Sequence, residues 1–180
     1  MSVFTNPKSR SKKQAAEYVA AVLDLLGARD PRDVLEKTPE VLKRVLEIMS
    51  QEQVAKAEAE GKWSIRQVLQ HLADSELVWG YRLRMVLAHN RPRIAGYDQD
   101  LWATRLGYDE SDPSEAVRDY STLRHMNLRL LERATPEDLK RVGLHAERGR
   151  ESLSHMIKLY AGHDILHVRQ IERIRRATAA

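Results

Sequence analysis

The stretch of sequence that decides the fold of this chain is Tyr160-Ala161-Gly162-His163-Asp164-Ile165-Leu166-His167-Val168-Arg169-Gln170-Ile171. Apolar residues recur in and around it at intervals of three and four, which is the pattern of an amphipathic helix. We therefore predict a final helix from about Glu151 to Arg176. His163 and His167 fall on its apolar stripe, about 5–6 Å apart at Cβ, and both can reach one divalent cation.

These two histidines have two interpretations, because imidazoles on a buried stripe need partners for their ring nitrogens. They could be core histidines bonded to carbonyls or carboxylates, but two at this spacing favour metal ligation. A firm site needs a third ligand. The best candidate is His71 on another predicted helix, with Asp164 as the runner-up. The hypothesis is a metal centre of His71, His163 and His167 with one open position, where the metal lowers the pKa of water toward neutrality.

Three polar residues are weaker candidates for catalysis. Asp74 follows His71 by three residues and could orient a ligand ring as a hydrogen-bond acceptor. Asp100 lies in a loop after the helix of His71 and could line the mouth of a pocket or cap a helix. Gln170 follows His167 by three residues and could contact the site or pair elsewhere in the core.

Gly162 stands directly before the first histidine of the pair. A glycine inside a helix is unfavourable by about 1 kcal/mol relative to alanine, so it often marks close packing. Two causes are open: a crowded metal centre, or close contact with a neighbouring helix.

The rest of the chain is also dominated by helical patterns. The clearest start is Ser64, which forms a capping box with Gln67, and this helix should end near His89. The other expected helices run from about Lys12 to Leu26 with Gly27 as C-cap, from Thr38 with Pro39 in its first turn, from Leu101 to Leu106, and from Asp112 to about Arg133. Residues 51–62 could prolong the second helix or form a loop, and residues 141–150 are expected to form an irregular connection. No segment shows convincing period-two alternation, so we expect no sheet and an all-α helical bundle.

Length and composition restrict the class of protein. The chain has 180 residues, enough for a single domain over 1–180, with residues 1–10 a loose polar arm. Charged residues make up 31%, but the net charge is only +4 and basic residues are spread along the chain, so no nucleic-acid partner is expected. No run approaches the ~20 apolar residues of a membrane span, so no membrane partner is expected. The absence of cysteine excludes disulfides, thiolate ligands and cysteine nucleophiles, and it is compatible with the cytoplasmic location that we expect.

Three motifs in order give the chain a family resemblance. They are Trp63-Ser64-Ile65-Arg66-Gln67-Val68-Leu69-Gln70-His71-Leu72-Ala73-Asp74-Ser75-Glu76, Tyr97-Asp98-Gln99-Asp100-Leu101-Trp102-Ala103, and the stretch 160–171 quoted above. Over roughly residues 35–176 the chain resembles the DinB-like (DinB/YfiT-like) superfamily of metalloenzymes. The resemblance implies a four-helix bundle with up-down-down-up topology and short extra helices, often homodimeric. It also implies a zinc or nickel ion held by His71, His163 and His167, with water completing the coordination.

The same family includes S-transferases and isomerases that use bacterial low-molecular-weight thiols, proteins named as metal-dependent hydrolases, and members with no assigned reaction. The resemblance therefore implies a divalent-metal-dependent enzyme for a small-molecule substrate, in which the metal activates water or a thiol for hydrolysis or S-transfer. The alternative is a non-catalytic, dimeric binding or stress-related protein with a structural metal or structural histidines. An open coordination position beside a cavity would favour the enzyme.

Overall fold

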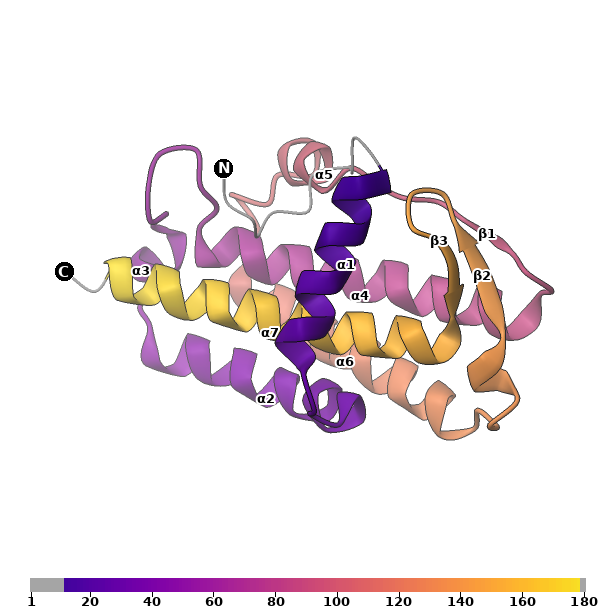
Figure 1. Ribbon diagram of the computed structural model, residues 1–180. Coiled ribbons are helices and arrows are strands. Elements are labelled where there is room, and N and C mark those ends of the chain that lie inside the picture. The colour runs from indigo at the N-terminus through magenta and orange to yellow at the C-terminus, as the bar shows by residue number, and fades with distance from the viewer. Residues whose placement is uncertain (1–11, 179–180) are drawn as a thin grey trace.

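Four long helices form the body of the protein. The computed structural model describes residues 12–178. In Figure 1 the helices α2 (Pro31–Ile48) and α7 (Leu153–Thr178) run in one direction, while α4 (Ile65–Ala88) and α6 (Pro113–Glu132) run in the other. In chain order this is the up-down-down-up arrangement, and the expected all-α four-helix bundle is confirmed. The loose arm expected at residues 1–10 lies outside the described residues.

Shorter elements connect and cover the bundle. They are the helices α1 (Lys12–Leu26), α3 (Gln51–Ala55) and α5 (Gln99–Arg105), a 3₁₀ turn at Asp138–Lys140, and the strands β1 (Arg93–Ile94), β2 (Val142–His145) and β3 (Gly149–Ser152). The stretch 51–62 that the sequence left undecided is thus α3 followed by a loop. The short helix expected near Leu101 and the helix expected after Asp112 are both present.

The capping box expected at the start of α4 is also present. The backbone N–H of Gln67 donates to Ser64 Oγ at 3.4 Å, and the backbone N–H of Ser64 donates to Gln67 Oε1 at 2.9 Å. Both bonds satisfy N–H groups that would otherwise lack a partner near the helix start. The helix therefore begins at Ile65 and places His71 two turns inside it, facing α7.

The first helix crosses the outside of the bundle and packs on α7 (Figure 1). It ends where the sequence indicated, since Gly27 has a φ of +56° and its N–H donates to the carbonyl of Leu23 at 3.0 Å. A Cβ atom at Gly162 would overlap the carbonyl oxygen of Val22 and lie 2.7 Å from its Cγ1. Gly162 therefore marks the close contact of α7 with α1, the second of the two causes considered from the sequence.

The expected start of the second helix at Thr38 is wrong. The helix begins at Pro31, seven residues earlier, with Asp30 as its N-cap. The Asp30 carboxylate accepts hydrogen bonds from two backbone N–H groups of the first turn, at 2.7 and 3.3 Å. An acidic N-cap followed by proline at the first helical position is a common helix start, and here it overrides the signal at Thr38.

Pro39 consequently lies inside α2, where proline usually breaks a helix. It cannot donate the hydrogen bond that the carbonyl of Leu35, four residues earlier, would normally accept. That carbonyl instead accepts a hydrogen bond of 2.8 Å from Nη1 of Arg124 on α6. The donor comes from a distant part of the chain, so local sequence patterns could not show that Pro39 is tolerated here.

The expectation that the chain has no sheet is wrong. β2 and β3 form an antiparallel hairpin within the segment expected to be irregular, and β1 pairs in parallel with β2. In β2 the buried residues are Gly143 and His145, whereas Leu144 is exposed, so the strand has no apolar alternation that a pattern search could find. A Cβ atom at Gly143 would overlap the side chain of Ile94 of β1, so the absence of a side chain at Gly143 leaves room for Ile94.

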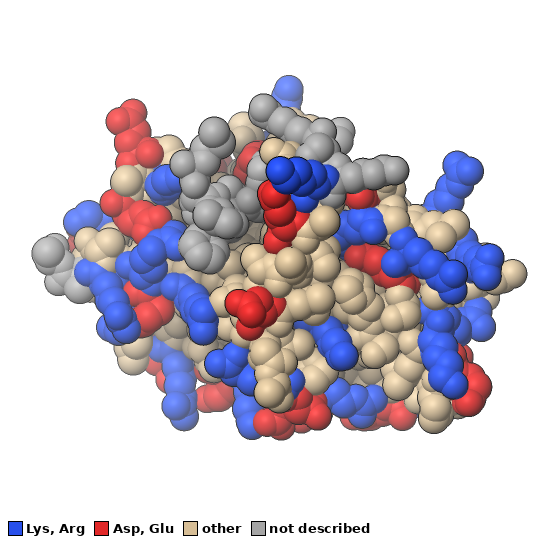
Figure 2. All heavy atoms as spheres, in the orientation of Figure 1, with Lys and Arg blue, Asp and Glu red and all other residues tan. Residues whose placement is uncertain are grey.

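The hairpin also shortens the last helix relative to the prediction. Glu151 belongs to β3, where its carboxylate accepts hydrogen bonds from Arg148 at 2.6 and 3.0 Å, and α7 begins only at Leu153. No helix within residues 12–178 is both long enough and apolar enough to cross a membrane. Figure 2 shows basic and acidic side chains interspersed over the face on which α1 and α7 lie.

Candidate metal centre

Three histidines from two helices converge inside the bundle. His71 comes from α4, and His163 and His167 come from successive turns of α7. Nε2 of His163 lies 3.3 Å from Nε2 of His71 and 3.1 Å from Nε2 of His167, and the ligand atoms of all three lie within 4.8 Å of one another. Two nitrogen ligands of a tetrahedral ion, at about 2.0–2.1 Å from it, are about 3.3 Å apart. The residues present therefore fit a divalent metal.

Burial keeps the three imidazoles neutral. Desolvation lowers the pKa of His167 to about 4. Desolvation, together with neighbouring histidines, holds the pKa of His71 and the pKa of His163 well below the ordinary value for histidine. Neutral imidazole is the form that binds metal ions. The cluster can therefore accept a cation near neutral pH without first losing protons.

Hydrogen bonding fixes the ring of His167 in particular. Its Nδ1 donates to Oε1 of Gln170 at 2.8 Å, which leaves the lone pair of Nε2 for the centre. Gln170 therefore contacts the site, one of the two alternatives considered from the sequence. Nδ1 of His71 is buried and has no hydrogen-bond partner among residues 12–178, and the ring of Trp63 packs against His71 with centroids 5.2 Å apart.

The carboxylates considered from the sequence have other partners. Asp74 accepts a hydrogen bond from the Tyr108 hydroxyl at 2.6 Å, and Asp100 is an exposed residue of α5. Among the hydrogen bonds of residues 12–178, none joins either carboxylate to a histidine of the cluster. The choice of Asp164 as runner-up ligand is wrong, because its two oxygens accept hydrogen bonds from Arg124 at 2.7 and 3.1 Å.

Arg124 is the centre of a buried charge network that the sequence analysis missed. It lies on α6 and donates to Glu76 on α4 at 2.8 Å and to Asp164 on α7 at 2.7 Å, and all three side chains are at most 2% exposed. Tyr120 donates to the Asp164 carboxylate at 2.9 Å, and Asn127 donates to that of Glu76 at 2.8 Å. Such a network holds three helices in one relative position, because breaking any part leaves a charge buried without its partner.

Two carboxylates of this network lie close to the histidines along the same helices. Asp164 directly follows His163 on α7, and Glu76 follows His71 on α4 by five residues. Fixing these two carboxylates on one guanidinium therefore fixes how α7 and α4 present their histidines to each other. The available sequence signal was Glu76 at core spacing, four residues after Leu72 and within an otherwise apolar stripe.

A cavity of about 50 Å³ lies beside the metal centre. His71 and His163 line it, together with Ser75 of α4 and Tyr97 from the loop before α5. Ser75 Oγ lies 3.3 Å from Nε2 of His71 and 3.0 Å from the Tyr97 hydroxyl. Sequence reasoning proposed neither hydroxyl as a site residue, although Ser75 follows His71 by four residues and therefore shares its face of α4. Tyr97 lies in a loop and has no such signal. The arrangement is a histidine cluster with a small polar cavity on one side.

The fold and the site define a class of protein: an up-down-down-up helical bundle in which three histidines on antiparallel helices are placed where a metal ion fits. The family model of the DinB superfamily matches residues 34–171. The chain therefore belongs to the DinB superfamily, as the motifs on α4 and α7 indicated.

Relatives of known sequence match most of the chain, and one solved structure shares its fold. "Putative metal-dependent hydrolase YfiT" of Bacillus subtilis is 30% identical over 144 residues, which is 79% of this chain and 81% of the relative. "Putative metal-dependent hydrolase OB0782" of Oceanobacillus iheyensis is 32% identical over 138 residues, 76% of this chain and 79% of the relative. The solved structure of Bacillus subtilis YfiT, described as "a probable metal-dependent hydrolase with an unusual four-helix bundle topology", matches with a TM-score of 0.75 and 27% identity, covering 96% of this chain and 92% of that one.

Proposed function

We propose that this protein is a metal-dependent hydrolase acting on a small-molecule substrate. The observation that carries the proposal is the convergence of three histidine nitrogens within 4.8 Å, beside a cavity of about 50 Å³. Zinc is the first candidate for the metal and nickel the second, because an imidazole site without thiolates suits both. The naming of the relatives as metal-dependent hydrolases supports this reaction over other uses of the site.

The chain's own residues have separate tasks in this proposal. A divalent cation at the centre would supply Lewis acidity and lower the pKa of water toward neutrality. Gln170 holds the ring of His167 in the orientation that directs Nε2 to the centre. Ser75 and Tyr97 place two hydroxyls beside His71, where they can donate to or accept from a polar group of the substrate. The Arg124 network keeps the two ligand-bearing helices in register.

The first test is metal content by elemental mass spectrometry, followed by hydrolysis of a panel of p-nitrophenyl esters after reconstitution with zinc or nickel. We expect about one ion per chain and activity that requires it. His163→Ala and His167→Ala should each lose metal and activity together. His125→Ala, an exposed histidine of α6, is the matched control and should change neither. Failure to take up either metal, or hydrolysis that survives chelation, contradicts the proposal.

A second experiment on the same protein distinguishes hydrolysis from thiol transfer, the other reaction implied by the family resemblance. Cobalt substitution gives the centre an absorption spectrum that changes when a thiolate coordinates. A new charge-transfer band with a low-molecular-weight thiol, together with turnover that depends on that thiol, would replace the hydrolase by an S-transferase. Bound metal with neither reaction would point to a structural role for the ion.

A further inference from the structure

Arg82 lines the same cavity from the far end of α4 and has a buried charge. Its side chain is 6% exposed. Its guanidinium donates from Nη2 to the carbonyl of Ala95 at 2.8 Å and from Nη1 to the Tyr160 hydroxyl at 3.3 Å, and it lies 6.0 Å from the ring centroid of Tyr97. A guanidinium has five N–H donors. These two bonds use two of them, so three are left for another partner.

No carboxylate forms an ion pair with this guanidinium within the described part of the chain. The cation in every ion pair of residues 12–178 is a residue other than Arg82. Arg148, in contrast, has a carboxylate partner. Arg148 lines the same cavity, but both oxygens of Glu151 neutralise it, at 2.6 and 3.0 Å. A buried charge without a counter-charge is costly, so proteins retain one where a ligand supplies the opposite charge.

The positive charge of Arg82 also acts on His145 of β2. The pKa of His145 on β2 is lowered to about 3, first by burial and then by the positive charges of Arg148 and Arg82. His145 Nδ1 accepts a hydrogen bond from the backbone N–H of Glu147 at 3.2 Å, and its buried Nε2 has no partner among residues 12–178. Within the cavity, the positive charge of Arg82 and its three remaining N–H donors therefore form an environment that favours an anion.

We propose that Arg82 binds a carboxylate of the substrate, so that the enzyme acts on small carboxylic acids. This inference rests on the proposed function for the reacting end of the molecule. The planar guanidinium fork matches a carboxylate in shape, and one unbalanced positive charge matches a monoanion better than a phosphate dianion. The Tyr160 hydroxyl accepts from Arg82 and keeps its own proton free to donate to the same group.

The position of Arg82 also sets the shape of the substrate. His71 and Arg82 are eleven residues apart on one helix, which corresponds to about 16 Å between their Cα atoms along the axis. The long side chain of Arg82 leans toward the start of the helix and shortens this separation. The carboxylate and the bond to be hydrolysed should therefore be several bonds apart, and short acids such as acetate should bind weakly.

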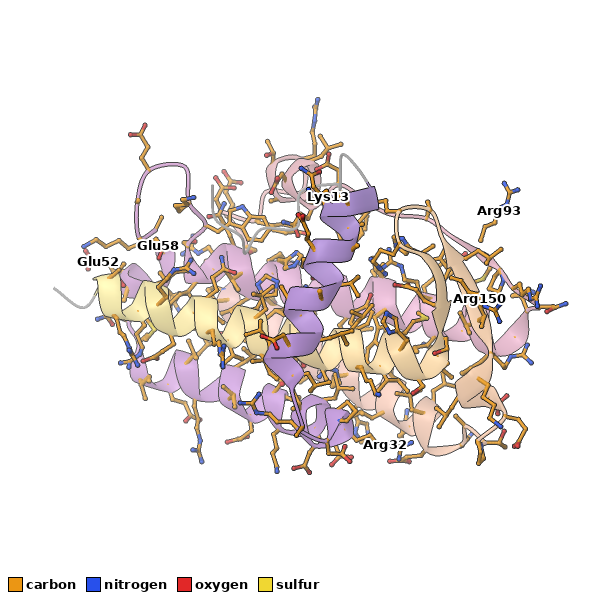
Figure 3. The ribbon with its side chains drawn as sticks, in the orientation of Figure 1. Lys13, Arg32, Glu52, Glu58, Arg93 and Arg150 are labelled. Atoms are coloured by element: carbon orange, nitrogen blue, oxygen red, sulfur yellow. The ribbon has the colours of Figure 1, made fainter. Side chains whose placement is uncertain are left out.

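The test is isothermal titration calorimetry with pentanoate, its neutral isostere pentanamide, and propyl phosphate, which is mainly a dianion just above neutral pH, on the full-length zinc-loaded protein. We expect pentanoate to bind at least tenfold more tightly than pentanamide and propyl phosphate. Arg82→Gln should weaken pentanoate binding at least tenfold. Arg93→Gln, which removes an exposed arginine of β1 that points away from the protein in Figure 3, should leave it unchanged. No pentanoate binding, equal binding of pentanamide, or unchanged binding by Arg82→Gln overturns the inference.

A second variant and a titration of metal-free protein complete the test. If Arg82→Gln does not fold, Arg82→Lys is used instead. Pentanoate binding at least threefold weaker in this variant supports binding of the carboxylate by the planar guanidinium, and unchanged binding overturns it. Titration of the chelator-treated protein separates this inference from the hydrolase proposal. Pentanoate binding that persists without metal and needs Arg82 supports the inference even if no ester is hydrolysed. Binding that needs zinc but not Arg82 means that the carboxylate is only a metal ligand.

Discussion

Replacing Arg124 with methionine should destabilise the protein by about 3–5 kcal/mol, because it leaves two buried carboxylates without their shared cation. Arg124 is 1% exposed and donates to Glu76 at 2.8 Å and to Asp164 at 2.7 Å. It also donates to the carbonyl of Leu35 that Pro39 leaves without a helical partner. For a domain of this size 1 kcal/mol corresponds to about 2–4 °C, so the melting temperature should fall by roughly 6–20 °C.

The loss of stability should depend on pH in a defined direction. Burial raises the pKa of Glu76 above its ordinary value even with Arg124 in place, and removing the guanidinium raises it further. A carboxyl group whose pKa is higher in the folded than in the unfolded chain costs stability at neutral pH, and this cost is relieved as the pH falls through the folded-state pKa. The difference between wild type and Arg124→Met should therefore be larger at pH 7 than at pH 5.

The assay is urea denaturation of the metal-free wild type and variant at both pH values, followed by circular dichroism. Arg118→Met is the matched control on the same helix. Its side chain is 67% exposed and its ion pair with Glu115 measures 3.1 Å, so it should cost no more than about 1 kcal/mol. A deficit below 1 kcal/mol for Arg124→Met at pH 7, or a deficit that grows on going to pH 5, would refute the reasoning.

Three other predictions follow from the geometry of α7. Gly162→Ala should lower the free energy of unfolding by about 1–2 kcal/mol in urea denaturation, because the new methyl group overlaps Val22 and the ~1 kcal/mol gain in helix propensity does not offset this; a stabilised variant would contradict the close contact. Gln170→Ala should weaken zinc binding about 10–100-fold in competition with a chromophoric chelator, because His167 loses its hydrogen-bond partner, and unchanged affinity would show that the bond is dispensable. The metal-free protein should lose stability as the pH falls from about 6.5 toward 5. Over this interval the histidines become protonated in the unfolded chain but stay neutral in the folded protein, because the folded-state pKa of His167 is lowered to about 4. A free energy of unfolding that stays constant over this interval would count against burial of the cluster.

Comparison of α2 and α4 shows why sequence patterns succeed for one helix and fail for the other. The start of α4 depends on Ser64 and Gln67, which are three residues apart and satisfy each other's backbone. The course of α2 through Pro39 depends on a donor from Arg124, 89 residues away from the carbonyl that it satisfies. The start of α2 at Asp30 and Pro31 is a local signal of the same kind as Asp112 and Pro113, whereas its continuation through Pro39 requires the donor that only the packed structure supplies.

The sequence by itself determined the long helices apart from the start of α2, the paired histidines of α7 and the membership of the bundle class, because these depend on spacings of three and four along one helix. The sequence offered His71 as the best third ligand, and the tertiary structure brings it to that pair. Only the tertiary structure decided that Asp164 pairs with Arg124 and that Arg82 lines a cavity with two of the histidines. It also produced the small sheet, whose buried positions in β2 are a glycine and a histidine. Contacts between distant segments are set by how the helices pack, and no local period along the chain encodes them.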